Sequence, residues 1–176
     1  LSTSNGEYQC ESLVVATGGL SMPKLGATPF GYKIAQQFGL NVLPTRAALV
    51  PFTLHEKDKE TLAELSGIAV DVYASCNDTT FKEAMLFTHR GLSGPAMLQI
   101  SSYWEAGDSL SINTLPNDDA TALIQTARNE TPDALLATSL NKVFPKRMVQ
   151  SFIEYHNWRN VPVKQLTHSE CDAIAD

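Results

Sequence analysis

The chain has 176 residues, of which 43% are hydrophobic and 18% are charged, a composition typical of a globular protein large enough to bury a core. The formal net charge of −6 predicts that its surface does not bind the phosphates of a nucleic acid. No apolar run approaches the roughly 20 residues that cross a bilayer, so no membrane partner is expected.

Residues 1–46 are predicted to form part of an α/β unit. Asn5-Gly6 is a hairpin-type turn, and residues 8–17 are expected to be a strand. The run Leu13-Val14-Val15-Ala16 has apolar residues at consecutive positions, which is typical of a strand buried on both faces. A helix is expected over residues 31–38, with Gly39 at its C-terminal end.

Residues 47–117 are predicted to be mostly strands. The strands are expected over residues 49–54, 68–74, 80–88 and 108–115, with helical segments over residues 58–65 and 95–104. Short antiparallel strands leave unpaired edges that need closure or cover. We therefore predict a small barrel or a curled sheet.

Residues 118–176 are predicted to be helical. Apolar residues recur at helical spacing from Ala120 to Ala127, and Thr131-Pro132 has the form of an N-cap followed by proline at the first helical position. Thr167 and Glu170 form a capping box, which predicts a helix that begins there. Because the first strand lacks a partner and this last helix is short, we expect the chain to be an internal piece of a longer protein.

A glycine-rich segment follows the first predicted strand. Thr17-Gly18-Gly19 places bare backbone at the carboxyl end of that strand, where ligands bind in open α/β sheets. Thr28 lies just before the predicted helix and Gly31 begins it, and the N-terminus of that helix could attract an anion. The alternatives from these residues alone are a tight strand-to-loop turn and a simple capping loop.

A second group of polar residues lies between the strand over 80–88 and the helical segment that follows it. His89 titrates near neutrality and Arg90 is a fixed cation, so the pair could hold an anionic substrate or the edge of a cofactor. Ser93 is expected to cap the following helix. A purely structural turn is the alternative. No catalytic acid or base is assigned, and His89 and Arg90 are the candidates for that role.

The cysteines and histidines do not form a recognisable metal site. Cys10, Cys76 and Cys171 are far apart and include no C-x-x-C pair, which argues against a disulfide framework and a zinc ribbon. There is no H-E-x-x-H motif or carboxylate cluster, so no metal is expected. This use of cysteine fits a reducing cytoplasmic location.

Four sequence blocks together resemble a known family. Residues 14–23, 25–32, 49–52 and 86–96 are similar, in the same order, to the YhiN/BaiN-like bacterial flavoproteins, which are NAD(P)/FAD-dependent oxidoreductases or NAD(FAD)-utilising dehydrogenases. The resemblance implies a Rossmann-like FAD domain interrupted by an inserted module. It also implies an α+β fold for this chain, with a small β-barrel-like sheet followed by a helical bundle.

The resemblance implies a role for each stretch of the chain. Residues 1–46 would be the end of the first half of the FAD-binding domain. Residues 47–117 would be an inserted β-barrel-like subdomain, and residues 118–176 the helical subdomain of the insert, incomplete at its C-terminal end.

Individual site residues follow from the same resemblance. Ala16, Thr17, Gly18 and Gly19 correspond to an FAD-contacting segment, Thr28 and Gly31 to the loop that returns beneath the cofactor, and His89, Arg90 and Ser93 to a signature of the inserted domain. The N-terminal G-x-G-x-x-G that would hold the FAD pyrophosphate is not in this sequence. We therefore expect this chain alone to bind FAD weakly or not at all, and to be inactive by itself.

Two hypotheses for function follow. In the first, the chain is the central segment of a cytoplasmic FAD-dependent oxidoreductase that acts on a small-molecule substrate, with NAD(P)H as a candidate reductant. The chain would supply one FAD-contacting loop and a lid, and its partners would be the other parts of the FAD domain. In the second, the insert is a stand-alone binding module for a protein partner or a small anionic ligand. A lid that makes no contacts of its own is a third interpretation.

Overall fold

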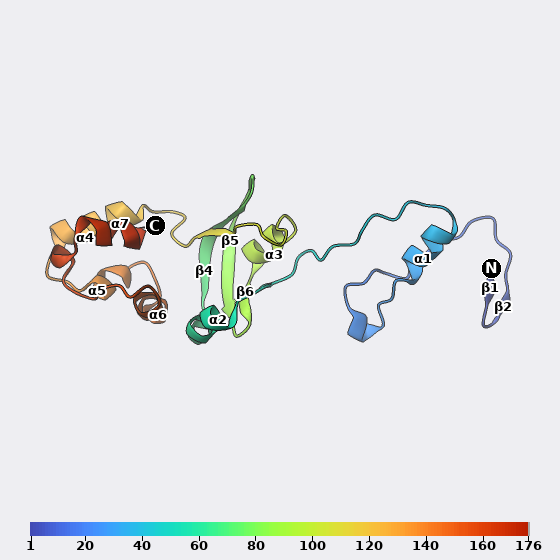
Figure 1. Ribbon diagram of the computed structural model, residues 1–176, viewed down its shortest axis with the longest axis horizontal. Helices are drawn as coiled ribbons and strands as arrows, with labels where there is room; N and C mark the ends of the chain where they lie inside the picture. The colour runs from blue at the N-terminus through green and yellow to red at the C-terminus, as the bar shows by residue number, and fades with distance from the viewer. Residues whose placement is uncertain (176) are drawn as a thin grey trace. The chain divides into compact units, whose positions relative to one another are not determined.

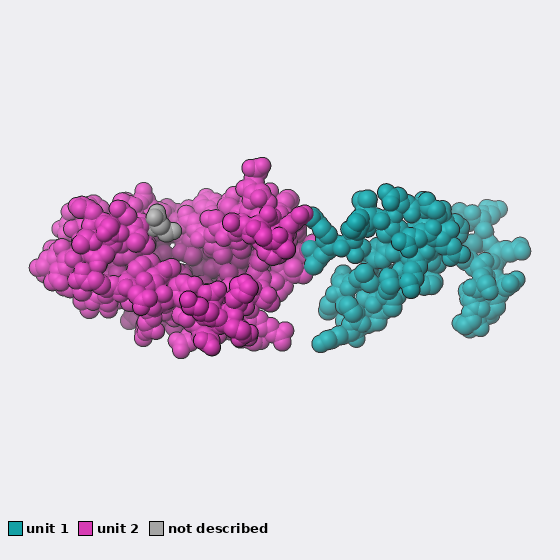
Figure 2. Space-filling model, in the orientation of Figure 1, with its two compact units in different colours: residues 1–47 teal, residues 48–176 magenta. Residues whose placement is uncertain are grey.

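The structure is a computed structural model that describes residues 1–175. The chain divides into two compact units, residues 1–47 and residues 48–176, which are coloured separately in Figure 2. None of the helices in the described part is both long and apolar enough to span a membrane. The assignment of these parts to a flavoprotein domain and its insert stays a prediction.

The first unit contains a hairpin and one α-helix. Strands β1 (Ser2–Thr3) and β2 (Gly6–Glu7) pair in antiparallel fashion, so the two-residue turn lies one position before the predicted Asn5-Gly6. After a short 3₁₀ turn, η1 (Pro23–Leu25), helix α1 spans Phe30–Gln37. The chain leaves α1 through Gly39 at a φ of 76°, a left-handed conformation that glycine adopts without a steric penalty. The predicted helix and its stop are confirmed.

The predicted strand over residues 8–17 does not form. No residue of this segment lies in a strand, although Tyr8 exchanges backbone hydrogen bonds with Leu1 beside the hairpin, and Val14 is 85% exposed. The prediction rested on consecutive apolar residues, which indicate a strand only where neighbouring strands and covering helices bury them. Without such neighbours in this chain, the backbone hydrogen bonds of a strand are not made.

The second unit contains a curled five-stranded sheet. Its strands are β3 (Phe52–Thr53), β4 (Ala69–Cys76), β5 (Thr79–Thr88), β6 (Gly91–Ser93) and β7 (Ser111–Asn113). They lie in the order β3-β6-β5-β4-β7, and every neighbouring pair is antiparallel (Figure 1). The predicted α+β class with a small curled sheet is confirmed. The strand predicted over 49–54 is shorter because Pro51 has no N–H to donate and Leu49 has a φ of 55°.

Alternating side chains on β4 and β5 form the main core. Val72, Ala74 and Cys76 are buried on β4, and Met85 and Phe87 are buried on β5. Helix α3 (Pro95–Ile100) lies on this face and buries Ala96, Met97 and Ile100 against the strands. The period of two in the sequence therefore matches the face that the helix covers.

Further helices pack beside the sheet and form a second layer. They are α2 (Glu56–Leu62), α4 (Ala120–Glu130), α5 (Leu136–Leu140), α6 (Lys146–His156) and α7 (His168–Ala175), with 3₁₀ turns η2 (Ala63–Leu65) and η3 (Val163–Gln165). In Figure 1, α4 runs beside α7, and α5 leads into α6. A second core lies among these helices and includes Leu136, Val149 and Val163.

Two predicted helix caps are wrong. Thr131 ends α4 rather than beginning a helix, and its hydroxyl donates to the carbonyl of Ala127. Ser93 lies in β6, paired with Leu86, so Gly94 occupies the N-cap of α3. In both cases the local sequence satisfied the rule for a cap, but hydrogen bonds to neighbouring elements fixed a different boundary.

The capping box at the start of α7 is confirmed. The backbone N–H of Thr167 donates to Glu170 Oε2 at 2.7 Å, and the Thr167 Oγ1 accepts from the backbone N–H of Glu170 at 3.2 Å. The Thr167 backbone N–H, its hydroxyl and the Arg159 guanidinium all stabilise the charged carboxylate and lower the pKa of Glu170.

This lowered pKa predicts a specific loss of stability in acid. The stabilisation is complete above about pH 4.3, the pKa of glutamate in an unfolded chain, and is lost as the pH falls through the lower folded value. Glu170→Gln is expected to lack this part of the pH dependence. Thermal melts of both proteins between about pH 6 and about pH 3 measure the difference. Parallel curves for the two proteins would contradict the role given to Glu170.

Candidate functional site

The structure brings part of the predicted glycine-rich site together in the first unit. A Cβ placed on Gly31 would lie 3.0 Å from Thr17 Oγ1, and one on Gly19 would lie 3.2 Å from the hydroxyl of Tyr32. The Thr17–Gly19 segment therefore lies against the first turn of α1, where the helix N–H groups have no intrahelical acceptor. This contact could not be predicted from the distance along the chain between the Thr17–Gly19 segment and α1.

The backbone of this segment is accessible. Gly18 has a φ of 70°, and a Cβ at that position would meet no atom within 4 Å. Ala16 and Thr28 are exposed. A planar or phosphorylated group could thus approach the main chain here without a side chain in the way. This chemistry fits one edge of a flavin nucleotide.

An apolar groove of about 500 Å³ continues from Gly31 along α1. Its other lining residues are Leu13, Val15, Ile34, Ala35, Phe38 and Leu40. The apolar run that was predicted to be a buried strand therefore contributes to the same surface as α1.

His89 and Arg90 form the exposed two-residue turn between β5 and β6. The Thr88 hydroxyl donates to the Gly91 carbonyl at 2.9 Å and accepts from the N–H groups of Arg90 and Gly91. These bonds hold the turn in one conformation and present both side chains to solvent. Neither side chain has a hydrogen bond or ion pair among the described residues, so both are free to meet a ligand.

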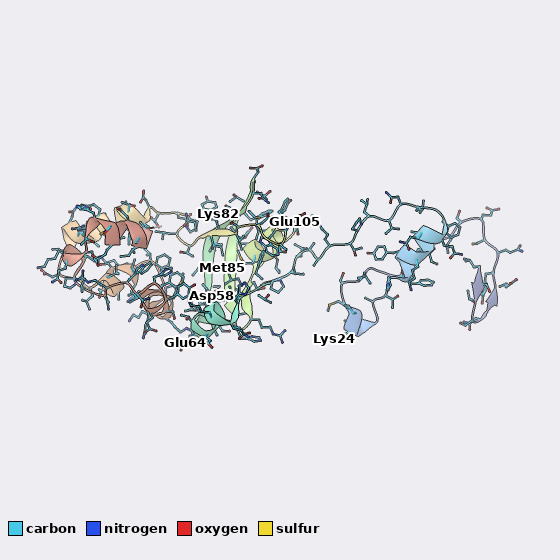
Figure 3. The ribbon with its side chains drawn as sticks, viewed as in Figure 1. Lys24, Asp58, Glu64, Lys82, Met85 and Glu105 are labelled. Atoms are coloured by element: carbon cyan, nitrogen blue, oxygen red, sulfur yellow. The ribbon has the colours of Figure 1, made fainter. Side chains whose placement is uncertain are left out.

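Neighbouring backbone segments fix the position of this turn. The Arg90 carbonyl accepts from the N–H of Leu54 at 3.2 Å, which also places His55 close to the turn. In Figure 3, Asp58 lies at the α2 end of the sheet, whereas Lys82 lies at its opposite end. The turn therefore lies beside the start of α2, whose first turn contains Glu56 and Asp58.

A cavity of about 590 Å³ lies between the sheet and the helices of the second unit. Its wall is mostly apolar, with polar groups from Ser111, Asn113, Thr114 and His156. The imidazole of His156 stacks on Trp158, with ring centroids 4.8 Å apart and an interplanar angle of 14°. Burial of the ring lowers the pKa of His156, so the imidazole is neutral at pH 7 and can both donate and accept a hydrogen bond.

This ring pair was not predicted from the sequence. His156 ends α6, and Asn157 at a φ of 54° turns the chain so that Trp158 lies over the imidazole. Asparagine at a helix end is the signal that could have indicated this turn. Within residues 1–175, no cluster of three or more His, Cys, Asp or Glu side chains is arranged to hold a metal.

The chain matches a described family and two curated proteins. The family model, described as HI0933-like protein barrel and H2TH domain, matches residues 46–176. The chain is 54% identical over 166 residues to a ribosomal RNA dihydrouridine synthase of Escherichia coli (strain K12), a match that covers 94% of this chain and 42% of that protein. It is 50% identical over 156 residues to a protein of the same name from Haemophilus influenzae, with 88% and 38% covered. The chain thus spans about two fifths of the length of these relatives.

These relatives contradict both functions predicted from the sequence. They are named for RNA modification, not for a general NAD(P)/FAD-utilising dehydrogenase with a small-molecule substrate or for a stand-alone binding module. The predicted exclusion of nucleic acid is also wrong. It rested on the net charge, which is a sum over the whole chain and does not describe any one part of the surface.

Proposed function

This chain belongs to the HI0933-like barrel and H2TH domain family, and from its identity to the two relatives we propose that it is part of an enzyme that makes dihydrouridine in ribosomal RNA. The resemblance to YhiN/BaiN-like flavoproteins is confirmed at the level of this family only, because the relatives are named for RNA modification. A substrate of this kind is cytoplasmic in bacteria, so the predicted location forms part of the same proposal.

The observation that carries the proposal is the identity to the two relatives. At 54% and 50% identity, the matches extend over 94% and 88% of this chain. Similarity of this extent includes both units, and therefore the glycine-rich segment as well as the sheet and helices.

The reaction saturates the C5=C6 bond of uracil. One hydride and one proton add across this bond, so the base gains two electrons and two hydrogens, and no group leaves. Amino-acid side chains do not supply hydride, so the reaction needs a redox cofactor. We assign this role to FAD, which when bound would supply the hydride, with NAD(P)H as the candidate source of its electrons.

The first unit would hold one edge of the flavin. The exposed Thr17 and Gly18 and the half-buried Gly19 lie against the first turn of α1, and Gly31 keeps that approach narrow. Ala16 and Thr28 are exposed in the same unit. We propose that these residues bind and orient the cofactor through main-chain N–H groups and the Thr17 hydroxyl.

The turn between β5 and β6 would face the substrate. Arg90 is a fixed cation with five hydrogen-bond donors, and the His89 imidazole can donate and accept hydrogen bonds. Both suit a polyanionic RNA better than an apolar ligand. Their exposure on a hydrogen-bonded turn supports this assignment.

Gly18→Ala is expected to lower the flavin content of the purified protein severalfold. A Cβ at this position enters the space where the cofactor would approach and strains the backbone by about 1 kcal/mol. Gly39→Ala is the matched control, since it has nearly the same positive φ, 76° against 70°, and equally open surroundings. Absorbance of bound flavin per chain measures the effect. An equal loss in the two variants would show that strain alone is responsible.

The reaction itself is tested in cells. Ribosomal RNA from a strain that lacks the gene is expected to contain less dihydrouridine than wild-type RNA, and the gene on a plasmid is expected to restore it. Mass spectrometry of nuclease digests detects the two hydrogens involved. Identical digests from both strains would contradict the proposed function.

A further inference from the structure

The cavity between the sheet and the helices of the second unit has an uncharged wall. Its volume of about 590 Å³ lies within the range of ligand-binding cavities, roughly 300–1,000 Å³. None of the described residues that line it is Asp, Glu, Lys or Arg. A charged ligand would lose its hydration there without meeting a counter-charge, so the cavity suits a neutral ligand.

Aromatic side chains form one part of this wall. The stacked imidazole of His156 and indole of Trp158 both line the cavity, together with Phe152. Phe152 and Tyr155 meet the imidazole edge to face, with ring centroids 5.9 Å and 4.9 Å from it. The Tyr155 hydroxyl donates to Asp58 Oδ1 at 2.9 Å, which holds the cluster against α2. Because His156 is also exposed, a planar molecule can reach this wall from solvent and stack on it.

The other polar groups of the wall come from β7 and the residues that follow it. Consecutive residues 111–115 line the cavity, so it borders the open edge of the sheet rather than one face. An edge strand has backbone N–H and C=O groups without a partner strand. Asn113 Oδ1 accepts from the Leu115 N–H at 2.8 Å. Asn113 Nδ2 and the hydroxyls of Ser111 and Thr114 have no partner among the described residues, so they are available to a ligand.

These properties of the wall define the class of ligand. The aromatic rings favour a planar molecule, and the lack of ionised groups favours a neutral one. The free donors and acceptors favour a molecule with a hydrogen-bonding edge, because an aliphatic ligand would leave them without partners. Nucleobases have all three features. Unpaired bases in RNA are recognised by stacking on aromatic side chains and by hydrogen bonds along their edges.

We propose that this cavity binds an unpaired base of the ribosomal RNA substrate. The inference rests on the proposed function, which supplies the RNA, and it adds a site for one of its bases. The base would stack on the aromatic wall that contains His156 and Trp158, and its edge would bond to Asn113 and β7. The phosphates would stay in solvent, since the wall contains no cation. Such a site selects unpaired RNA over a duplex, in which the bases are already stacked and paired.

The test is quenching of tryptophan fluorescence in the protein as the cell makes it. A single-stranded RNA oligonucleotide is expected to quench Trp158, because a stacked base is in contact with the indole. An oligonucleotide with the same backbone but no bases is expected not to quench it. Trp158→Phe is expected to lose the quenching but to bind within about fivefold of wild type, since phenylalanine also stacks on bases. Trp104→Phe is the matched control and is expected to keep both, since Trp104 packs on Phe52 and does not line the cavity.

Asn113→Asp tests the polar edge of the site. The substitution keeps the acceptor for the Leu115 N–H but replaces the amide donor with a carboxylate oxygen. We expect the affinity for the oligonucleotide to fall at least about fivefold. Asn117→Asp adds the same charge outside the cavity wall, at a side chain whose Oδ1 accepts from Lys82 at 2.6 Å, and is expected to bind within about twofold of wild type. Equal losses in the two variants would overturn the contact with Asn113.

The outcomes separate this inference from the proposed function. If wild-type protein makes dihydrouridine but no oligonucleotide quenches Trp158, the inference is wrong and the proposed function stands. If the oligonucleotide quenches Trp158 but the protein makes no dihydrouridine, the proposed function fails and the base site stands. Equal quenching by oligonucleotides with and without bases would overturn stacking. Quenching by NAD(P)⁺ but not by the oligonucleotide would overturn RNA as the source of the base.

Discussion

Gly91→Ala is expected to lower the free energy of unfolding by at least about 3 kcal/mol. Gly91 has a φ of 150°, and a Cβ at this position would lie 2.1 Å from the backbone carbonyl of Phe52. Because that carbonyl belongs to β3, the edge strand must separate from β6 to make room. The turn that presents His89 and Arg90 would move with it, so loss of RNA modification is expected too.

Gly107→Ala is the control that measures the cost of backbone strain without a clash. Gly107 also has a positive φ, 104°, but a Cβ there meets no atom within 4 Å. Its cost is therefore expected to be about 1 kcal/mol. Chemical denaturation of both variants measures the two values. Equal losses would contradict the close approach of β3 and β6.

Leu136→Ala is expected to cost about 3 kcal/mol of unfolding free energy. Leu136 is fully buried in the core between the helices, against Val149 and Val163 among others. Removal of its branched side chain leaves a cavity that the two short helices α5 and η3 cannot fill without moving.

The neighbouring residue provides the control for this substitution. Leu135 is 42% exposed, and Leu135→Ala is expected to change the unfolding free energy by less than about 1 kcal/mol. Denaturant titrations of the two single variants compare a buried leucine with an exposed leucine at the adjacent position. Similar losses would show that the α5–η3 region is not packed as described.

The central strands of the sheet could be predicted because the sequence pattern that specifies them is local. Alternation from Ala69 to Cys76, the Asn77-Asp78 turn and the alternation that follows define β4 and β5 without distant information. The segment from Leu13 to Ala16 could not be predicted in this way. Consecutive apolar residues indicate burial, but only neighbours in space decide whether a strand forms.

Only the packing of the glycine-rich segment can be compared with the sequence, and its role in binding a ligand stays a prediction. Glycines at residues 18, 19 and 31 indicated a close approach of backbone to a ligand, and the structure places this segment against α1. The stacking of His156 on Trp158 depends on the chain reversal at Asn157, which apolar periodicity does not encode. The nucleic acid in the names of the relatives was missed because a net charge of −6 is a sum over the whole chain and does not describe any one part of its surface.

Reduction of uridine in ribosomal RNA is the activity that we propose for the whole protein. The most direct measurement incubates the purified protein as the cell makes it, with FAD and NAD(P)H, and ribosomal RNA that contains no modified bases. Nuclease fragments are then weighed by mass spectrometry. We expect one uridine-containing fragment to gain the mass of two hydrogens, and only when the reductant is present. An unchanged set of fragments from flavin-loaded, reduced protein would contradict the account.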